Sequence, residues 1–123
     1  MTDPTPSIFP SMRFADADTA LDWLGRAFGF EAGDVHRDDA GVVRHAEMSL
    51  GNGAIMFGQG DPTRTGVYVA VADADAHYAR AAAAGAEITR EVDDTPYGSR
   101  EYGARDPEGH AWTFGTYQPR PGA

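Results

Sequence analysis

His45 and Glu47 are the two residues whose types and spacing come closest to those of a catalytic site. They lie on an expected strand, residues 42–50, where side chains at i and i+2 point to the same face. An imidazole and a carboxylate on one face can form an acid–base pair or supply half of a metal site, and the pKa range of histidine suits a general base. The simpler interpretation, two polar groups on a partly solvated strand, is favoured.

Arg100, Tyr102 and Ala104 alternate along another expected strand. The forked guanidinium of Arg100 could bind a ligand carboxylate or phosphate, although pairing with a nearby Glu or with the turn around Asp106 is favoured. No two histidines are spaced at i and i+4 as helical metal ligands, and we expect His77 to face water. The chain has no cysteine, which excludes a disulfide framework, a zinc knuckle and a thiol nucleophile.

Two stretches of the chain recur at one constant offset. Ala15–Asp18 reappears as Ala72–Asp75, and Ala54–Gly58 reappears in outline as Ala111–Gly115, each about 57 residues later. The first pair opens expected helices and the second pair forms expected strands. One spacing therefore links both kinds of element and predicts two copies of one structural module.

Each copy has the same expected order: strand, helix, strand, strand, strand. An aspartate caps each helix, and the apolar stripe of the first helix places Trp23 and Phe28 in the core before Gly29 ends it. We expect module one at about residues 8–58 and module two at about 66–117, within a single domain that spans residues 1–123.

The composition narrows the classes of partner. A net charge of −9 disfavours nucleic acid and anionic membranes, because both are bound through basic residues. It is compatible with a neutral or cationic ligand. We find no apolar run long enough to span a bilayer and no basic-then-apolar leader, so we expect a cytoplasmic protein. All basic residues are Arg, which with the many Ala and Gly suggests a bacterial genome.

Several short motifs stand out along the chain: Phe14–Asp16, Phe28–Phe30, His45–Glu47 with Gly51–Gly53, Ala84–Ile88 and Asp106–Trp112. Together they resemble the vicinal oxygen chelate superfamily, which includes glyoxalase I, extradiol dioxygenases, fosfomycin-resistance transferases and bleomycin-resistance proteins. The resemblance covers about residues 8–117. It implies an α+β fold in which two βαβββ modules form an open, cup-like mixed sheet with flanking helices. It also implies a homodimer and a binding site in or beside the cup. One fold hosts many functions, so no reaction is named by it.

In metal-dependent members of that superfamily, each module contributes one ligand from its first strand and one from its last. Carried over, these positions are Phe9 or its neighbour Pro10, Met56, Val67 and Thr113. Apolar side chains, a thioether and a lone hydroxyl do not suit a hard or borderline divalent ion. We therefore expect no family-type metal centre and no cofactor.

The expected lining of the cup follows from these positions and from the alternation of strand faces. If Thr113 faces the cup, Trp112 and Phe114 face the helices and belong to the core. The expected ligand-binding residues are Phe9, Glu47, Met56, Val67, Val69, Arg100, Tyr102 and Thr113. This mostly apolar lining suits an organic molecule.

These observations favour a metal-free binding protein of bleomycin-resistance type, which sequesters a small organic ligand or an antibiotic in the cup. The alternative is an enzyme: a glyoxalase-type lyase, a dioxygenase, or a metal-free isomerase that uses His45 or Glu47. A third possibility is a regulatory domain with a vestigial cup. We expect a homodimer, because pairing would cover sheet edges and apolar surface.

Overall fold

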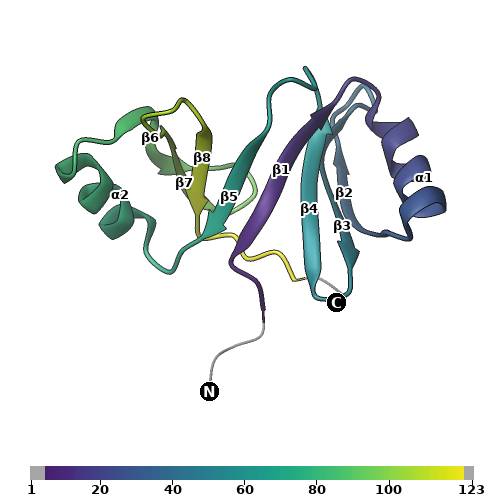
Figure 1. Cartoon of the computed structure of the whole chain (residues 1–123), viewed down its shortest axis with the longest axis horizontal. Coiled ribbons are helices and arrows are strands. Elements are labelled where there is room, and N and C mark those ends of the chain that lie inside the picture. Colours follow the sequence, from purple (N-terminus) through teal and green to yellow (C-terminus); the bar gives the residue numbers. More distant parts are fainter. Residues whose placement is uncertain (1–4, 121–123) are drawn as a thin grey trace. The chain divides into compact units, whose positions relative to one another are not determined.

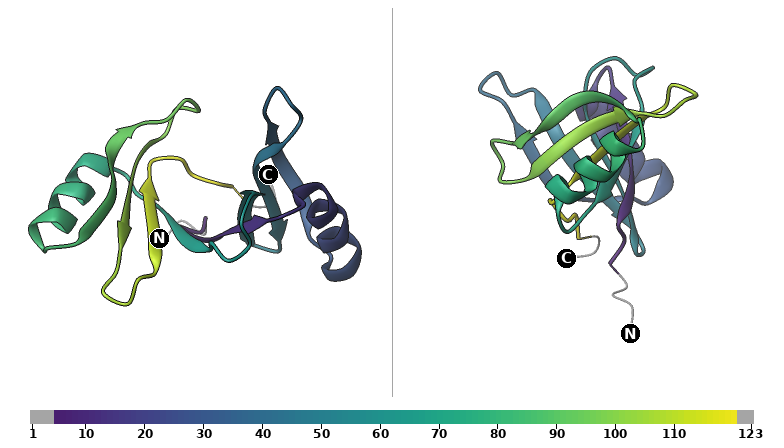
Figure 2. Two further views of the ribbon diagram at one scale, coloured as in Figure 1. Left: turned by 90° about the horizontal axis from the view of Figure 1, so that it is seen from above. Right: turned by 90° about the vertical axis from the view of Figure 1, so that its left-hand side faces the viewer.

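A computed structural model describes residues 5–120, so residues 1–4 and 121–123 of the expected domain lie outside the described residues. The described residues divide into two compact units: unit 1 comprises residues 5–65 with 119–120, and unit 2 is Gly66–Gln118. Each unit contains a strand, a helix and three further strands, and each helix lies against its own sheet (Figures 1 and 2). The predicted α+β class and order of elements are confirmed. That both units belong to one domain stays a prediction.

In unit 1, the first and the last strand lie side by side. The elements are β1 (Ile8–Phe14), α1 (Ala17–Phe28), β2 (Glu31–Arg37), β3 (Val43–Leu50) and β4 (Gly53–Gln59). The strand order is β2-β3-β4-β1, in which β1 and β4 are parallel and the other neighbours are antiparallel.

Helix α1 begins at a side-chain cap and covers a packed core. The Asp16 carboxylate accepts a hydrogen bond from the Thr19 backbone N–H at 3.1 Å, and the helix ends at Gly29, whose φ of 80° is left-handed. The buried residues of the helix and the sheet form one cluster: Ala17, Ala20, Leu24, Val43, Ala46, Met48 and Phe57.

Trp23 and Phe28 do not belong to this core, contrary to expectation. They are 46% and 57% exposed, and their rings pack edge to face with centroids 4.7 Å apart. For Trp23 the reason is its position around the helix: Leu24 lies on the inward-facing side, and Trp23 is about 100° away from it. Phe28 is the last residue of the helix.

Unit 2 has the same order of elements, but fewer residues of its helix are buried. Its elements are β5 (Gly66–Ala70), α2 (Ala74–Ala83), β6 (Glu87–Asp94), β7 (Arg100–Arg105) and β8 (Ala111–Gly115). The strand order is β5-β8-β7-β6, with β5 and β8 parallel. Asp73 caps α2 by accepting a hydrogen bond from the Ala76 backbone N–H at 3.0 Å. Ala74 is the buried residue of this helix. No helix within residues 5–120 is long and apolar enough to cross a membrane.

Candidate functional site

The sheet of unit 1 has one face under α1 and one face turned away from it. Met48 and Phe57 are in the core beneath α1, so their sequence neighbours Glu47 and Met56, which are register partners, lie on the other face. Ser11 pairs with Met56, which places Phe9, two residues before Ser11, on that face as well. Phe9, Glu47 and Met56 therefore share a face. Phe9 is fully buried and Met56 nearly so. That they bind a ligand stays a prediction.

His45 and Glu47 lie together on the same face. The imidazole Nε2 is 2.7 Å from the Glu47 carboxylate Oε2, and the side chains are 32% and 12% exposed, respectively. The ring of His36, on the neighbouring strand, lies with its centroid 5.9 Å from that of His45. A carboxylate that bonds one ring nitrogen orients the imidazole. The two side chains therefore have the arrangement of an oriented acid–base pair.

In unit 2, the strand register separates residues that were expected to share a face. Thr113 pairs with Tyr68 on one side and with Gly103 on the other. Val67 pairs with Trp112, and Val69 and Tyr102 both pair with Phe114. Since neighbours in register point the same way, Val67, Val69 and Tyr102 lie on the face opposite to Thr113. The expectation that these three line one surface with Thr113 is wrong.

The cause is a change of one residue in the repeat offset. Met56 and Thr113 are related by about 57 residues, but their register partners Glu47 and Gly103 are related by one residue fewer. The stretch between equivalent register partners is therefore one residue longer in the β7–β8 hairpin than in the β3–β4 hairpin. A slip of one residue moves every side chain of a strand to its other face.

Arg100 lies toward α2 and is held by two aspartates. Its guanidinium donates hydrogen bonds to Asp75 of α2 at 2.8 and 3.0 Å and to Asp94 at 3.1 Å. Within residues 5–120, its acidic partners are these aspartates and not a glutamate or the turn at Asp106, so the favoured sequence interpretation named the wrong partners. Arg100 joins α2 to its sheet, and any role in ligand binding stays a prediction.

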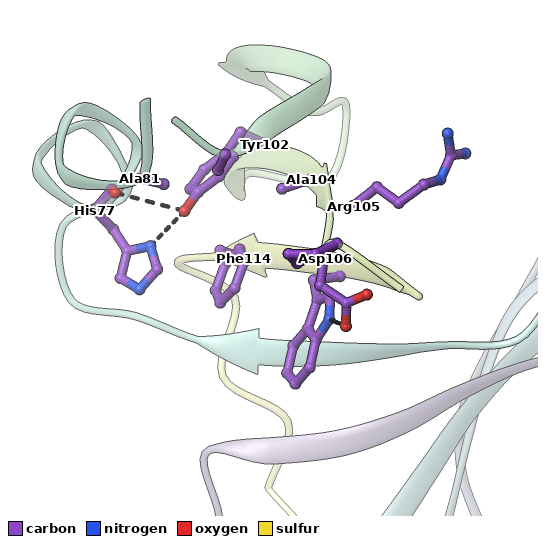
Figure 3. Close-up of a pocket in the computed structure, with 10 residues that line it drawn as sticks. His77, Ala81, Tyr102, Ala104, Arg105, Asp106 and Phe114 are labelled. Atoms are coloured by element: carbon purple, nitrogen blue, oxygen red, sulfur yellow. Dashed lines mark hydrogen bonds between the residues drawn. The ribbon is translucent and has the colours of Figure 1, made fainter. Parts of the chain in front are cut away.

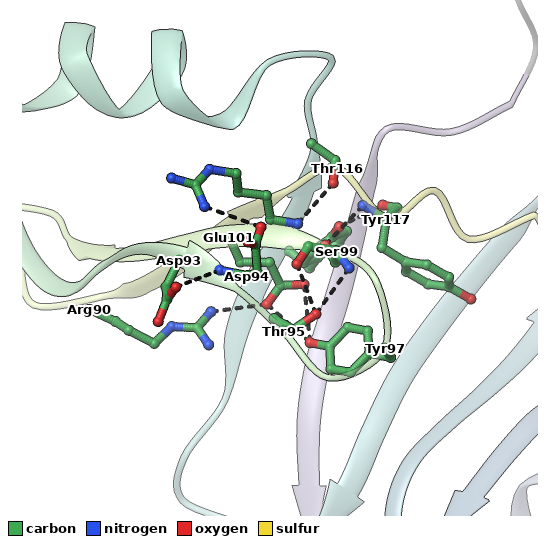
Figure 4. A network of polar contacts seen from close by, with 11 residues as sticks. Arg90, Asp93, Asp94, Thr95, Tyr97, Ser99, Glu101, Thr116 and Tyr117 are labelled. Carbon is green, nitrogen blue, oxygen red and sulfur yellow. Dashed lines mark hydrogen bonds and ion pairs between the residues drawn. The ribbon is translucent and has the colours of Figure 1, made fainter.

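The face of unit 2 that carries Thr113 also carries a buried carboxylate, which sequence reasoning missed (Figure 4). Glu101 is 5% exposed and accepts hydrogen bonds from Arg90 at 3.0 Å and from the Tyr97 hydroxyl at 3.1 Å. Burial, and then the charge of Glu101, raise the pKa of Tyr97, so this phenol stays a donor at neutral pH. A Cβ at Gly115 would collide with Glu101 and with the Tyr68 hydroxyl, which explains the glycine. The Glu101 carboxylate already accepts these hydrogen bonds, so its role is structural.

A pocket of about 360 Å³ lies between α2 and the sheet of unit 2 (Figure 3). Its lining is almost wholly apolar and includes His77, Ala81, Tyr102, Ala104, Trp112 and Phe114. Trp112 and Phe114 face the helix, as expected, but they line this pocket and are only half-buried. Sequence reasoning missed the pocket.

The walls of the pocket are fixed by ring contacts and by two polar pairs. The Tyr102 ring stacks on Phe114 with centroids 5.1 Å apart, and the Trp112 ring lies within 6° of parallel to Phe114. His77, expected to face water, is half-buried: its ring centroid is 4.4 Å from that of Phe114, and its Nδ1 is 2.5 Å from the Tyr102 hydroxyl. Burial raises the pKa of Tyr102.

The second polar pair is at the other end of the pocket. The Trp112 indole N–H donates to the Asp106 carboxylate at 3.0 Å. This bond, followed by the bond from the His110 backbone N–H, holds the pKa of Asp106 well below its ordinary value. The carboxylate is therefore ionised at neutral pH, and it orients the indole.

The pattern of the glyoxalase/bleomycin resistance protein/dioxygenase superfamily matches residues 10–114 of the sequence. The chain belongs to this superfamily, which confirms the resemblance inferred from its motifs.

Three relatives illustrate the range of similarity. TioX from Micromonospora sp. ML1 is 37% identical, with 85% of this chain and 93% of TioX covered and a TM-score of 0.41. An uncharacterised protein of Mycobacterium tuberculosis H37Rv is 28% identical, with 89% of this chain and 74% of the relative covered. The methylmalonyl-CoA epimerase of Mycobacterium tuberculosis is 17% identical, with 97% and 93% covered and a TM-score of 0.69. The last likeness supports the fold alone.

The residues at the superfamily's metal positions do not fit a hard divalent ion. Met56 and Thr113 offer a thioether and a hydroxyl, and the register places Ser11 and Tyr68 beside them on the first strand of each unit. Within the part of the chain that the structure describes, no three His, Cys, Asp or Glu side chains come together as a metal site. A metal-free protein stays a prediction that rests on this donor chemistry.

Proposed function

We propose that the protein binds a small organic molecule by non-covalent contacts and without a metal ion, as a binding protein of bleomycin-resistance type. The observation that carries the proposal is the side-chain chemistry at the superfamily's metal positions, above all Met56 and Thr113. A thioether and a neutral hydroxyl cannot replace the imidazole and carboxylate ligands of a metal-dependent enzyme. Both groups can contact an organic ligand.

Glu47 is the residue best suited to recognise the ligand on the unit 1 face. Its side chain remains 12% exposed next to the apolar Met56, and its carboxylate accepts hydrogen bonds. A carboxylate on a chain of net charge −9 favours a neutral or cationic ligand over an anion. We therefore place a ligand with a donor or a positive group at Glu47.

We also propose that the protein is a cytoplasmic homodimer. The support is its exposed apolar surface, which includes Ile8, Trp23, Phe28 and Leu50. Pairing of two copies would cover such side chains. Light scattering at micromolar concentration should give the mass of a dimer, and a monomer mass would contradict this.

The binding proposal is tested with bleomycin, the one ligand that the superfamily's description names. Native mass spectrometry after treatment with a chelator should detect about one bleomycin per chain, with no dependence on added Zn²⁺. Glu47→Gln should weaken binding about tenfold, because it removes the charge and keeps the shape. Glu31→Gln, the same change at an exposed position of β2, is the control and should leave binding unchanged. Absence of any complex would contradict the proposal.

A metal-free isomerase is the second candidate, and the 2.7 Å contact between His45 and Glu47 favours it. Such a pair could remove a proton next to a thioester carbonyl and leave an enolate, which would be inverted when water supplies a proton to its opposite face while the pair releases the first proton to solvent. Incubation with methylmalonyl-CoA in D₂O tests this. Deuterium incorporation that is lost in Glu47→Gln would support the isomerase, and no incorporation would contradict it.

A further inference from the structure

The pocket beneath α2 exists because two positions that are large in unit 1 are small in unit 2. The helices begin at Ala17 and Ala74, each after a capping aspartate. Counted from these starts, Leu24 and Ala81 occupy the same place in their helices. Leu24 is 8% exposed and fills the core of unit 1, whereas Ala81 lines the pocket of unit 2.

The second position lies in the sheet. Met48 is the register partner of Ile55, and Ala104 is the register partner of Trp112, in the equivalent pairs of strands. Met48 is 2% exposed and packs in the core of unit 1. A leucine and a methionine are thus each replaced by alanine, one above and one below the same space. The volume that they would fill remains open.

The size and lining of this space limit what can occupy it. An apolar cavity of about 150 Å³ stays dry and accepts benzene, so about 360 Å³ suits a two-ring molecule. The polar atoms at its ends already have partners: His77 with Tyr102, and Asp106 with Trp112. Ordered water would find few bonds there.

The walls favour a flat, uncharged occupant. Three aromatic rings line the pocket, and those of Tyr102 and Trp112 lie within 22° and 6° of parallel to Phe114, so a flat ring can pack against this group. The ionised Asp106 at one end repels an anion, and Arg105 beside it is paired with Glu87 at 3.0 Å.

We propose that this pocket binds a neutral two-ring aromatic group of a small molecule, stacked on Phe114 and Trp112 beneath Ala81. The site goes beyond the proposed function, because it lies within unit 2 on the helix side of the sheet and shares no residue with the face of Glu47 and Met56. The two sites can therefore be tested independently.

The test uses 1-naphthol and its saturated, non-planar counterpart decahydro-1-naphthol in titrations followed by ¹H–¹⁵N spectra of the whole chain. 1-Naphthol should bind with a dissociation constant below about 1 mM and shift the amides of Ala81 and Ala104 and the indole N–H of Trp112. Decahydro-1-naphthol should bind about tenfold more weakly. Equal affinity for the two compounds, or shifts confined to unit 1, would overturn the proposal.

A second test fills the pocket with the larger side chains that unit 1 has at the equivalent positions. Ala81→Leu and Ala104→Met should each weaken 1-naphthol binding about tenfold, because they occupy its volume. Ala83→Leu, the same change at an exposed position of the same helix, is the matched control and should bind as the native protein does. Unchanged binding by folded Ala81→Leu would overturn the proposal. If a variant does not fold, the chemical-shift changes that 1-naphthol causes in the native protein test the proposal instead.

Discussion

Helices α1 and α2 begin at similar aspartate caps, yet they cover their sheets differently. Helix α1 buries Leu24 against a sheet that carries Met48 and Phe57. Helix α2 sets Ala81 above Ala104 and Phe114, and about 360 Å³ stays open between them. Caps and strand register keep the framework of each unit, whereas a few side-chain volumes decide whether the interface of helix and sheet is a core or a pocket.

The largest expected effect separates the two faces of β4 in unit 1. Phe57 is 2% exposed beneath α1, so Phe57→Glu should bury an unpaired charge and lower the free energy of unfolding by about 3–5 kcal/mol. Met56 is itself only 8% exposed and lies beside Glu47, so Met56→Glu should also destabilise the protein, but by less, because α1 does not cover that face. Thermal melts of the two variants measure this difference in stability. A worse outcome for Met56→Glu would reverse the assignment of faces.

The next largest loss of stability is expected for Leu24→Ala, because it removes a core side chain that has no counterpart in α2. The expected loss of unfolding free energy is about 2–5 kcal/mol. Ala81→Leu at the equivalent place in unit 2 should cause no loss, because the added side chain enters open volume. Urea unfolding of both variants measures the contrast. Similar destabilisation by the two changes would mean that unit 2 is as closely packed as unit 1.

Removal of the helix caps should have a smaller effect that sharpens the same contrast. Asp16→Ala and Asp73→Ala should each lower the free energy of helix unfolding by about 1 kcal/mol. Helix α2 has the weaker attachment, so Asp73→Ala should speed amide hydrogen exchange throughout α2, whereas Asp16→Ala should affect mainly the first turn of α1. Equal protection of both helices in these variants would contradict the difference in packing.

The smallest expected effect concerns acid stability. Hydrogen bonds from Trp112 and from the His110 backbone hold the pKa of Asp106 below its ordinary value. A lowered pKa in the folded state stabilises the protein above the unfolded-state pKa, about 4, and this contribution is lost as the pH falls through the folded-state value. Asp106→Asn should therefore lose less stability than the native protein between neutral pH and pH values below about 4. Urea midpoints across this range provide the measurement, and an unchanged pH dependence would contradict the role of Asp106.

Much of the fold could be predicted from the sequence, because local signals carry it. The capping aspartates, the stop at Gly29 and the recurring offset predict both helices and the order of the strands. Strand alternation also places Met56 and Phe57 on opposite faces. These features depend on neighbouring residues and on periodicity, which the sequence contains directly.

The candidate site was predicted less well, because it depends on register and on missing volume. One extra residue between equivalent register partners of β7 and β8 moves Tyr102 to the helix side, and the repeat offset alone does not reveal the change. The pocket arises from two alanines, Ala81 and Ala104, which are unremarkable until they are aligned with Leu24 and Met48. The repeat offset aligns Ala81 with Leu24 and is the signal that could have pointed to the pocket, whereas Ala104 is equivalent to Met48 only once the strand register is known.

The most direct test of the proposed function is native mass spectrometry of the chelator-treated protein with bleomycin, with and without added Zn²⁺. The same complex, about one bleomycin per chain, is expected in both conditions, with no retained metal ion. A complex that forms only with Zn²⁺, or a protein that retains about one metal ion per chain, would contradict the proposed function.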